Sequence, residues 1–422
     1  MNATTGLFRN RWWVVFATVC ALVVGAGPIN VFTFGVFLKP ITQDLGVGRG
    51  VLSSALTLHG VIAAFALPVI GWMVDRWGVR RILLPGIFVY ALATASYALI
   101  QASPLVLTFL IFAATGFFGG VGSPIPFAAV IAGWFDRQRG LALGIGMSGV
   151  GLGVALMPQL AAALIAAFGW RFAYVGLAIA IVLLAYPPVV LFLREPPGFA
   201  ARTHRRQDPA VMALAPGASV GEALRTWVFW GLSIAFLLDV IAINGTLTHI
   251  VAVLTDRGVP LQAATATLSG SGLALILGRI LSGWCLDRVW GPYVAIAFFI
   301  LPMIGIASLA SGAGGLAPFL GAIGLGLGIG AEIDLMAFFT SRFFGLRNYA
   351  KLYGMMFGIF ALGVGVGPAL SGMSFDRFHS YTPAFVIFMV MLAAGCIVFL
   401  RLGPYPYPPL DQALGAQEKI PA

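Results

Sequence analysis

Long apolar stretches, each close to the length of a membrane-spanning helix, constrain this chain more than any other feature of its sequence. An α-helix needs about 20 apolar residues to cross the hydrocarbon core of a bilayer. Charged residues make up only 9% of the 422 residues, which would leave the surface of a water-soluble protein of this size almost without charge. The stretches are continuously apolar rather than alternating, which excludes a β-barrel. We therefore predict an all-α membrane protein.

Twelve transmembrane helices are predicted, arranged as two pseudo-symmetric six-helix bundles. The one long connection, Arg194 to Arg225, contains turn-forming prolines and glycines and a basic cluster at 202–206, so we interpret it as a cytoplasmic linker. It separates an N-terminal bundle (1–193) from a C-terminal bundle (226–401), and the proline-rich cytoplasmic tail (402–422) is expected to be disordered. The expected spans are 12–38, 51–74, 82–101, 105–134, 141–167, 172–193, 226–254, 261–285, 292–311, 315–341, 352–374 and 382–401.

The basic residues are distributed unequally between the two sides of the membrane. With the N-terminus inside, 18 of the 24 lysines and arginines fall in inner loops, five fall in outer loops, and Arg279 lies within a span. This asymmetry follows the positive-inside rule and predicts a multi-pass protein of the inner (plasma) membrane with both termini cytoplasmic. The net charge of +10 therefore reflects topology in a lipid bilayer, and we expect no nucleic-acid partner. We also expect a monomer.

Neither a cofactor nor a metal site is expected. The three cysteines, Cys20, Cys285 and Cys396, lie far apart in or at the ends of apolar spans and match no metal-site spacing or disulfide framework. No loop contains a Ser/His/Asp set, paired catalytic carboxylates or a zinc-site spacing, so we predict that the protein is not an enzyme. No extramembrane segment is long enough to fold as a receptor or enzyme domain.

Arg279 lies inside the expected eighth span. A cation at that depth costs on the order of 3 kcal/mol on insertion scales, so it needs an acidic partner, a watery cavity or an anionic ligand. One interpretation is a structural ion pair inside a helix bundle. The other is an anion-binding arginine in a transport pathway. We favour the second, because intramembrane charge is costly to retain without a use.

Two acids of the tenth span are expected near Arg279. Arg279 lies eight residues before Asp287, and Asp334 lies eight residues before Arg342. Both spans run inward, so Arg279 and Asp334 share a depth and Glu332 lies about 3 Å nearer the midplane. Residues two apart point about 200° apart, so only one acid is expected to face the arginine.

We hypothesise that this acid pairs with Arg279 when the site is empty. A substrate carboxylate then competes for the guanidinium, which suits bidentate carboxylate binding better than lysine does. The released acid takes up a proton. A permanent structural pair without proton traffic is the alternative.

Other candidate site residues lie in the remaining spans. Asp239, in the middle of the seventh span, is a further candidate for proton coupling, because an unpaired acid there must be protonated or face water. His249, further outward, could relay a proton, although a lone buried histidine is more often a hydrogen-bonded packing residue. Each candidate for the lining of a mostly apolar substrate cavity could equally be a packing residue. These candidates are Asn30, Phe117, Phe118, Met147, Tyr353 and Phe357.

One loop motif occurs three times. The segment Gly71–Gly78 after the second span is echoed by Gly283–Arg288 after the eighth and by Gly372–Arg377 after the eleventh. The glycine strings at 149–153 and 363–367 also correspond, and we expect them to permit close helix contact rather than to bind phosphate. Repeats in two six-span halves are typical of alternating-access transporters.

The loop motif is expected to act as a breakable latch that closes the cytoplasmic side. Asp75, at a helix end, can cap the N-terminus of a neighbouring helix, where an anion is favoured. The arginines that follow can pair across the halves in one conformational state. A plain determinant of topology is the alternative, and it is compatible with the latch. The gating residues are Gly71, Asp75, Arg76, Gly78, Arg80, Arg81, Gly283, Asp287 and Arg288.

The sequence GWMVDRWGVRR at 71–81 resembles the loop motif of the major facilitator superfamily. The segment 134–149 resembles the span four-to-five region of monocarboxylate transporters, and 30–37 and Arg279 are similar to that family and to oxalate/formate-type antiporters. The chain departs from animal members at Leu275, where they carry an acid one helical turn before the arginine, and at Asn30, where an acidic-glycine motif is expected in span one.

The resemblance implies a secondary transporter. Its cargo would be a small organic anion, a monocarboxylate, carried with protons as two halves rock around a midplane site. Anion exchange is one alternative to proton symport. The other is proton-driven export of amphipathic drugs or siderophore-like compounds.

Overall fold

The computed structural model describes residues 10–407 except 103–104, 136–137, 196–216 and 346. The basic cluster at 202–206 and most of the predicted disordered tail lie outside the described residues, as does the side chain of Asp75. The described part is almost entirely helical and contains no strand.

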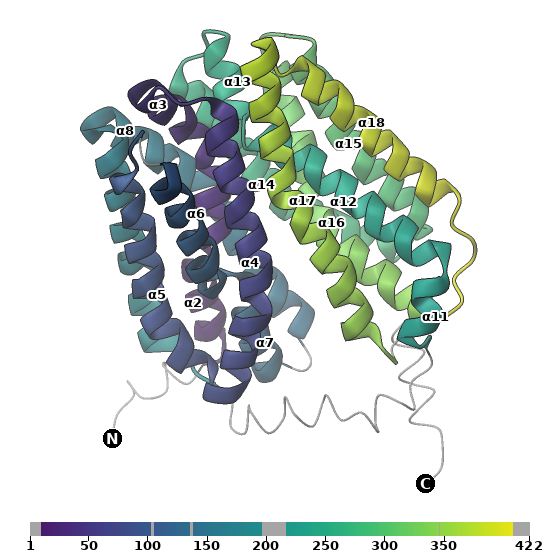
Figure 1. Cartoon of the computed structure of the whole chain (residues 1–422). Coiled ribbons are helices and arrows are strands. Elements are labelled where there is room, and N and C mark those ends of the chain that lie inside the picture. Colours follow the sequence, from purple (N-terminus) through teal and green to yellow (C-terminus); the bar gives the residue numbers. More distant parts are fainter. Residues whose placement is uncertain (1–9, 103–104, 136–137, 196–216, 346, 408–422) are drawn as a thin grey trace, which may run out of the picture.

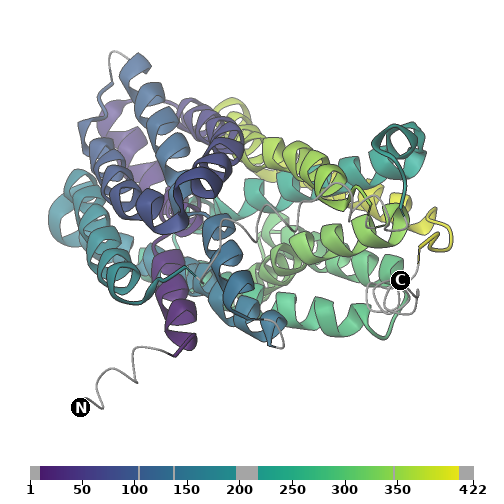
Figure 2. The ribbon, with the colours of Figure 1, turned by 90° about the horizontal axis from the view of Figure 1, so that it is seen from below.

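The helices form two groups, shown from the side in Figure 1 and from below in Figure 2. We call α2 to α8 the N-terminal half and α11 to α18 the C-terminal half. The N-terminal half consists of α2 (Trp12–Val23), η1 (Gly27–Phe32), α3 (Phe34–Leu45), α4 (Arg49–Trp77), α5 (Val79–Ala95), η2 (Ser96–Leu99), α6 (Leu105–Gly119), η3 (Gly120–Gly122), α7 (Pro124–Trp134) and α8 (Arg139–Phe192). The C-terminal half consists of α11 (Val220–Arg225), α12 (Trp227–Leu247), α13 (Ile250–Asp256), α14 (Leu261–Leu286), α15 (Gly291–Ala310), α16 (Ala317–Phe344), α17 (Tyr349–Phe378) and α18 (Thr382–Leu400).

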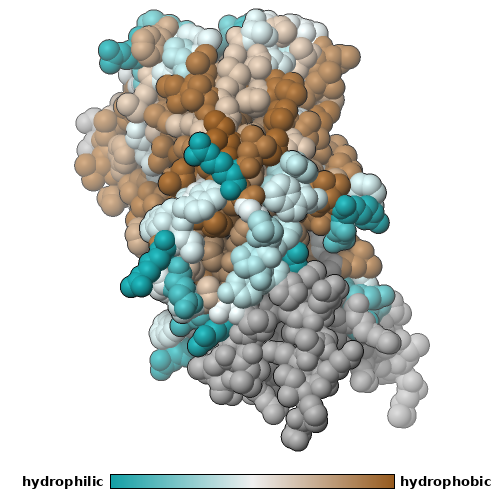
Figure 3. Space-filling model, turned by 90° about the vertical axis from the view of Figure 1, so that its right-hand side faces the viewer, coloured by the Kyte–Doolittle hydropathy of each residue, from teal (hydrophilic) through white to brown (hydrophobic). Residues whose placement is uncertain are grey.

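The described helices contain 11 segments long and apolar enough to cross a membrane. One of them, Leu141–Phe192, has 52 residues, which is twice the length that a span needs. The backbone of Gly169, at φ 78° and ψ 166°, is not helical and divides α8 into two spans. The predicted fold of twelve transmembrane helices is confirmed. Hydrophobic side chains form a broad zone across the face shown in Figure 3, as a bilayer requires.

Three predicted spans are interrupted rather than continuous. The first stops at Val23 and passes through the π-helix Gly27–Phe32 before α3 begins. The fourth breaks between α6 and α7, and the seventh breaks between α12 and α13. Glycines and Pro28 explain the first break, because they weaken the helical hydrogen-bond ladder. Such discontinuous helices commonly surround the binding sites of transporters.

The halves meet along two seams, α4 with α17 and α8 with α14. The middle glycine of each predicted string faces the opposite half. A Cβ on Gly151 would lie 2.7 Å from the carbonyl oxygen of Gly272, and one on Gly365 would lie 2.6 Å from the Cα of Thr57. The flanking glycines face α2 or α12 of their own half. These glycines are Gly149, Gly153, Gly363 and Gly367. The expectation of close helix contact is confirmed.

The α4–α17 seam is closed at one end only. Contacts join residues 49–60 of α4 to residues 365–376 of α17. Towards the end at which α2 begins and α18 ends, the two helices diverge (Figure 1). There a Cβ added to Gly71 or Gly354 would meet no atom within 4 Å. We call these two ends the closed end and the divergent end.

Candidate functional site

Glycines in α16 bring α14 close to it and so position Arg279. A Cβ on Gly330 would lie 3.0 Å from the backbone nitrogen of Arg279, and Gly278 of α14 packs against the backbone of Leu327. Small residues at these positions permit backbone contact between membrane helices. The side chain of Arg279 therefore projects from α14 at a point where α14 touches α16.

Arg279 forms an ion pair with Asp334, as their equal helix depth predicts. The Nε of Arg279 lies 3.4 Å from Oδ2 of Asp334, and the two side chains are 25% and 36% exposed. In the described part of the chain Nε has no hydrogen-bond partner. The pair is therefore held by charge rather than by an aligned hydrogen bond, and both of its side chains are partly exposed.

Asp239 and Glu332 form a second acidic group, which we call the carboxyl pair. Asp239 of α12 is 1% exposed and Glu332 of α16 is 2% exposed, and their carboxyl groups hydrogen-bond to each other. Among the described residues, Oδ1 of Asp239 and Oε1 of Glu332 are buried without a partner. Two ionised carboxylates buried side by side repel each other, so this arrangement favours a proton on one of the two.

Four phenyl rings, which we call the phenyl cluster, pack on the divergent-end side of the carboxyl pair. Phe236 lies one helical turn from Asp239, and Phe339 lies two turns from Glu332. Ring centroids are 6.4 Å apart between Phe236 and Phe339 and 5.5 Å apart between Phe339 and Phe399. Phe299 completes the cluster, 4.9 Å from Phe399.

Tyr353 and Phe357 of α17 lie near the ion pair. Tyr353 interacts electrostatically with both Asp334 and Arg279. Its ring stacks on that of Phe357 with centroids 6.0 Å apart, and Phe357 in turn lies 5.6 Å from Phe360. This aromatic ladder supplies an apolar wall beside a charged group, which is how small-molecule sites are usually built.

The remaining predicted cavity residues lie in the N-terminal half. Asn30, in the π-helix, is 4% exposed and donates to the hydroxyl of Tyr90 at 3.3 Å. Its Oδ1 is buried without a hydrogen-bond partner in the described residues. Met147 is buried, whereas Phe117 and Phe118 are exposed and pack edge-to-face on each other. In the described part of the chain, no hydrogen bond, ion pair or ring contact joins any of these four residues to Arg279.

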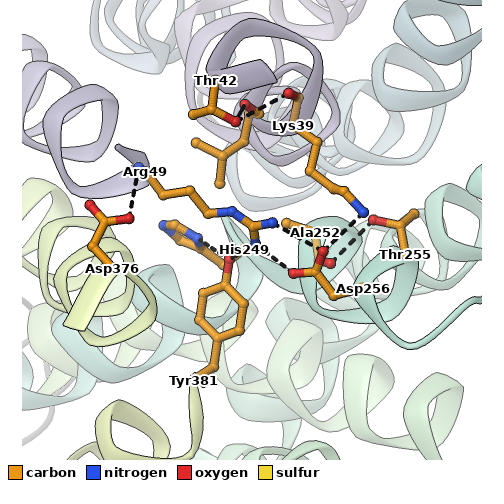
Figure 4. Close-up of polar contacts among 10 residues, drawn as sticks. Lys39, Thr42, Arg49, His249, Ala252, Thr255, Asp256, Asp376 and Tyr381 are labelled. Atoms are coloured by element: carbon orange, nitrogen blue, oxygen red, sulfur yellow. Dashed lines mark hydrogen bonds and ion pairs between the residues drawn. The ribbon is translucent and has the colours of Figure 1, made fainter. Parts of the chain in front are cut away.

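An ion-pair network closes the seam at the closed end (Figure 4). Arg49, at the start of α4, contacts both carboxylate oxygens of Asp256 at 2.5 and 3.0 Å and the hydroxyl of Tyr381 at 2.5 Å. Lys39 adds a second cation at 2.9 Å from Asp256. Burial would raise the pKa of Asp256, but hydrogen bonds from the two cations outweigh it and lower the pKa below 3.8.

Asp376, at the end of α17, caps the first turn of α4. Its carboxylate accepts hydrogen bonds from the backbone nitrogens of Arg49 at 2.9 Å and Gly50 at 2.7 Å. An anion there meets unpaired N–H groups and the positive end of the helix dipole. Asp376 belongs to the third copy of the loop motif, so a helix cap from that copy joins the halves at the closed end. The latch predicted for the copy at 71–81, on the cytoplasmic side, stays a prediction.

His249 lies in this network rather than beside the ion pair. Its Nε2 is 3.2 Å from the hydroxyl of Ser53 and 3.1 Å from the carbonyl of Pro368, and its Nδ1 is 3.4 Å from the hydroxyl of Tyr381. The ring thus joins α4, α17 and the start of α18. This placement makes His249 a packing residue of the closed end in this conformation.

The described contacts of Arg76 and Arg80, in the gating motif after α4, lie within their own half. Gly78, at φ 88°, adopts the left-handed conformation that turns α4 into α5. Arg76 stacks on Trp72, and Arg80 donates through its backbone nitrogen to Glu195 at 2.9 Å. Arg81 is exposed. The second copy is similar, because Asp287 is exposed, Arg288 stacks on its own helix and Gly283 is free of close neighbours.

Sequence reasoning missed Arg49, Asp256, Asp376 and Tyr381 as functional residues. Lys39 and Arg49 were predicted only as outer-loop cations. The echo Gly372–Arg377 was the signal that could have identified Asp376, because it repeats the aspartate of the loop motif. No local pattern marks Tyr381.

A groove of about 860 Å³ lies beside the closed end, between α4, α6, α17 and α18. Its lining is mostly apolar and includes Phe109, Met373 and Ile387. None of the predicted substrate or proton residues lines it, so it is separate from the site around Arg279.

Residues 20–350 match the family model described as Major Facilitator Superfamily. The oxalate:formate antiporter of Oxalobacter formigenes is 26% identical and covers 95% of this chain and 94% of its own. Monocarboxylate transporter 13 of Bos taurus is 26% identical over 93% of this chain and 89% of its own, and the uncharacterized MFS-type transporter YcxA of Bacillus subtilis is 24% identical over 93% of each.

Solved structures share the fold. A structure of the nucleoside transporter NupG has a TM-score of 0.75 at 13% identity, covering 92% of this chain and 99% of its own. A D-xylose-proton symporter has a TM-score of 0.73 at 13% identity, covering 93% and 97%. At these identities the likeness concerns the fold alone.

Proposed function

Because this chain belongs to the Major Facilitator Superfamily, we propose that it is a secondary active transporter of a small organic anion, a monocarboxylate, coupled to protons. The cargo binds to Arg279 between the two halves, which rock to expose the site to one side of the membrane and then to the other. The observation that carries this proposal is the partly exposed ion pair of Arg279 and Asp334, at 3.4 Å.

The geometry of that pair suits competition by a carboxylate. A guanidinium presents donors in a planar fork that fits a carboxylate bidentately, whereas Asp334 contacts Arg279 through Nε without an aligned hydrogen bond. A cargo carboxylate can make a better contact and release Asp334. Tyr353 and Phe357 border this position and would contact the apolar part of a small cargo.

The relatives support an anionic cargo. The names of the oxalate:formate antiporter and of monocarboxylate transporter 13 refer to carboxylates. The first of these relatives also makes anion exchange the leading alternative to symport. Multidrug resistance protein B homolog of Mycobacterium tuberculosis, 27% identical over 64% of this chain, keeps export of amphipathic compounds as a testable alternative.

The distribution of positive charge indicates which end of the protein faces the cytoplasm. Inner loops of a membrane protein carry the excess of lysine and arginine, which supports a cytoplasmic position for the divergent end. The described conformation is then inward-facing, with the network of Arg49, Asp256 and Asp376 closing the outer side. We propose the inner (plasma) membrane as its location.

A thermal-shift screen of the purified protein tests the proposal. Short monocarboxylates, dicarboxylates and cationic dyes are compared on the wild type, Arg279→Ala and the control Arg171→Ala. Arg171 is 42% exposed and is also paired with an acid, Asp44, at 2.5 Å, but within the N-terminal half. A ligand at about 100 times its Kd stabilises the folded state by about 2.7 kcal/mol.

A monocarboxylate should raise the melting temperature of the wild type and of Arg171→Ala but not of Arg279→Ala. Stabilisation by dyes that persists in Arg279→Ala would support the exporter and contradict the proposal. Uptake into proteoliposomes then separates the two modes of coupling. An imposed pH gradient alone drives a symporter, whereas an exchanger requires anion inside the vesicle.

A further inference from the structure

We propose that the carboxyl pair, Asp239 with Glu332, is the proton carrier of this transporter. It holds one proton when the site is empty and two when an anion occupies Arg279. This inference rests on the proposed function and assigns the proton that the function requires. It differs from the sequence-based hypothesis, in which an acid released from Arg279 takes up the proton.

The burial and contact of the pair favour a proton shared between its two carboxyl groups. Asp239 and Glu332 are 1% and 2% exposed and hydrogen-bond to each other. Two adjacent ionised carboxylates in a dry interior repel strongly, and ionised carboxylates have no hydrogen to share. The pair in this conformation therefore has at least one proton and at most one negative charge.

Asp334 is less suited to carry the proton. Its side chain is 36% exposed, and Arg279 lies 3.4 Å away as a counter-ion. Its carboxyl group is therefore less enclosed than those of the carboxyl pair and already has a cation beside it. Oδ1 of Asp239 and Oε1 of Glu332, by contrast, are buried without a hydrogen-bond partner in the described residues.

Few charged or titratable groups among the described residues interact with the carboxyl pair. Arg279 of α14 interacts electrostatically with Glu332, and Cys396 of α18 interacts electrostatically with Asp239. Gly363 of α17 packs against Val240, next to Asp239, and the phenyl cluster lies towards the divergent end. Arg279 is therefore the cation that connects the pair to the cargo.

The coupling follows from a charge balance. In the empty site Arg279 and Asp334 cancel, and the singly protonated pair has one negative charge. A bound cargo adds a second negative charge beside Arg279 and weakens the attraction of that cation for the ionised carboxylate. A new O–H bond then forms on the pair with a proton taken from water. The site returns to one negative charge, so the loaded and empty carriers move the same charge.

Release reverses these steps. When the anion leaves Arg279 at the divergent end, the guanidinium again attracts Glu332. The second O–H bond breaks, and its proton passes to water. One anion and one proton cross together, which makes transport electroneutral.

Infrared spectroscopy of the protein reconstituted in lipid tests the first step without any cargo. The wild type at neutral pH should show the C=O stretching band of a buried, protonated carboxylic acid. Glu332→Gln and Asp239→Asn should each shift that band, because either leaves a single buried acid with a changed partner, and the two combined should abolish it, whereas Asp334→Asn, the matched control on the same helix, should leave it in place. Either of the two variants can still test the proposal if the other one fails to fold. Absence of the band in the wild type, or its loss only in Asp334→Asn, would overturn the proposal.

Proton uptake and transport in proteoliposomes test the second step, with formate and lactate as probes. Glu332→Gln should keep exchange of labelled probe but lose pH-driven accumulation by about tenfold or more, since one pK unit already corresponds to a tenfold change. Asp44→Asn, at an acid that pairs with Arg171 within the N-terminal half, should keep pH-driven accumulation. If Glu332→Gln accumulates probe as the wild type does, the proton assignment is wrong, although anion binding at Arg279 stands. If Arg279→Ala also binds and transports normally, the proposed function itself fails.

Discussion

Removing the Asp376 carboxylate should open the closed end while leaving each half intact. Asp376 is the one side chain of the network that binds the other half through backbone groups, since it accepts from the nitrogens of Arg49 at 2.9 Å and Gly50 at 2.7 Å. In Asp376→Ala these donors lose an acceptor in the closed conformation. In the open conformation water solvates these donors in the wild type and in the variant alike. The substitution therefore destabilises only the closed conformation.

The size of the effect follows from the cap. Loss of a helix cap costs about 0.5–2 kcal/mol, and loss of an anion at a helix N-terminus costs about 0.3–1 kcal/mol. We take about 2 kcal/mol for both together, which shifts the ratio of open to closed conformers by about 30-fold. The bidentate pair of Arg49 and Asp256 remains, so the closed conformation stays populated.

Cysteine labelling measures the shift. Ser53 is fully buried in the seam beside His249 and Gly372. In Ser53→Cys, in a background without the three native cysteines, a membrane-impermeant maleimide can react only after the seam opens. Its rate should rise by about 30-fold in Asp376→Ala.

Asp44→Ala provides the control for charge. Asp44 is an acid near the same end, but it pairs with Arg171 of the N-terminal half. Its loss should leave the labelling rate unchanged. If Asp376→Ala labels no faster than Asp44→Ala, the cap does not hold the halves together and this reasoning is wrong.

Three further predictions concern the same seam. In Gly365→Val the side chain meets the backbone of Thr57 and costs about 1–3 kcal/mol of overpacking, so Ser53→Cys should label faster; Gly358→Val, where nothing lies within 4 Å, should not change the rate. Arg49→Lys keeps the charge but loses the bidentate contact with Asp256, and it should also label faster, though less than Arg49→Ala. The lowered pKa of Asp256 stabilises closure fully above pH 3.8, and this contribution is lost as the pH falls through that lowered pKa, so spin labels across the seam should move apart on acidification.

Much of the architecture could be predicted, because apolar length and the positive-inside rule act locally along the chain. The ion pair of Arg279 and Asp334 also followed from local geometry, since equal residue offsets on two helices running the same way give equal depth. Which of Glu332 and Asp334 faces the arginine depends on how α16 is rotated against α14. The glycines set that rotation, and the sequence pattern does not encode it.

The partners of the remaining charges depend on tertiary structure. Asp239 and Glu332 are 93 residues apart and meet only because α12 packs on α16. Arg49 and Asp376 are 327 apart and meet only in a conformation with this end closed. The interruption of the first span was missed for a different reason, because hydropathy does not distinguish a continuous helix from one that is interrupted at Pro28.

Along each glycine string, the middle glycine faces the other half and the flanking glycines face their own half. This arrangement separates thermal stability from the rate of transport, two properties that are usually linked. A methyl group added at Gly149 or Gly153 adds volume inside the N-terminal half and so changes the stability of that half. The same group at Gly151 widens only the distance between halves and acts on the rate of the cycle. Heat resistance and turnover can therefore be tuned independently within five residues of one helix, and again within the matching five residues of α17.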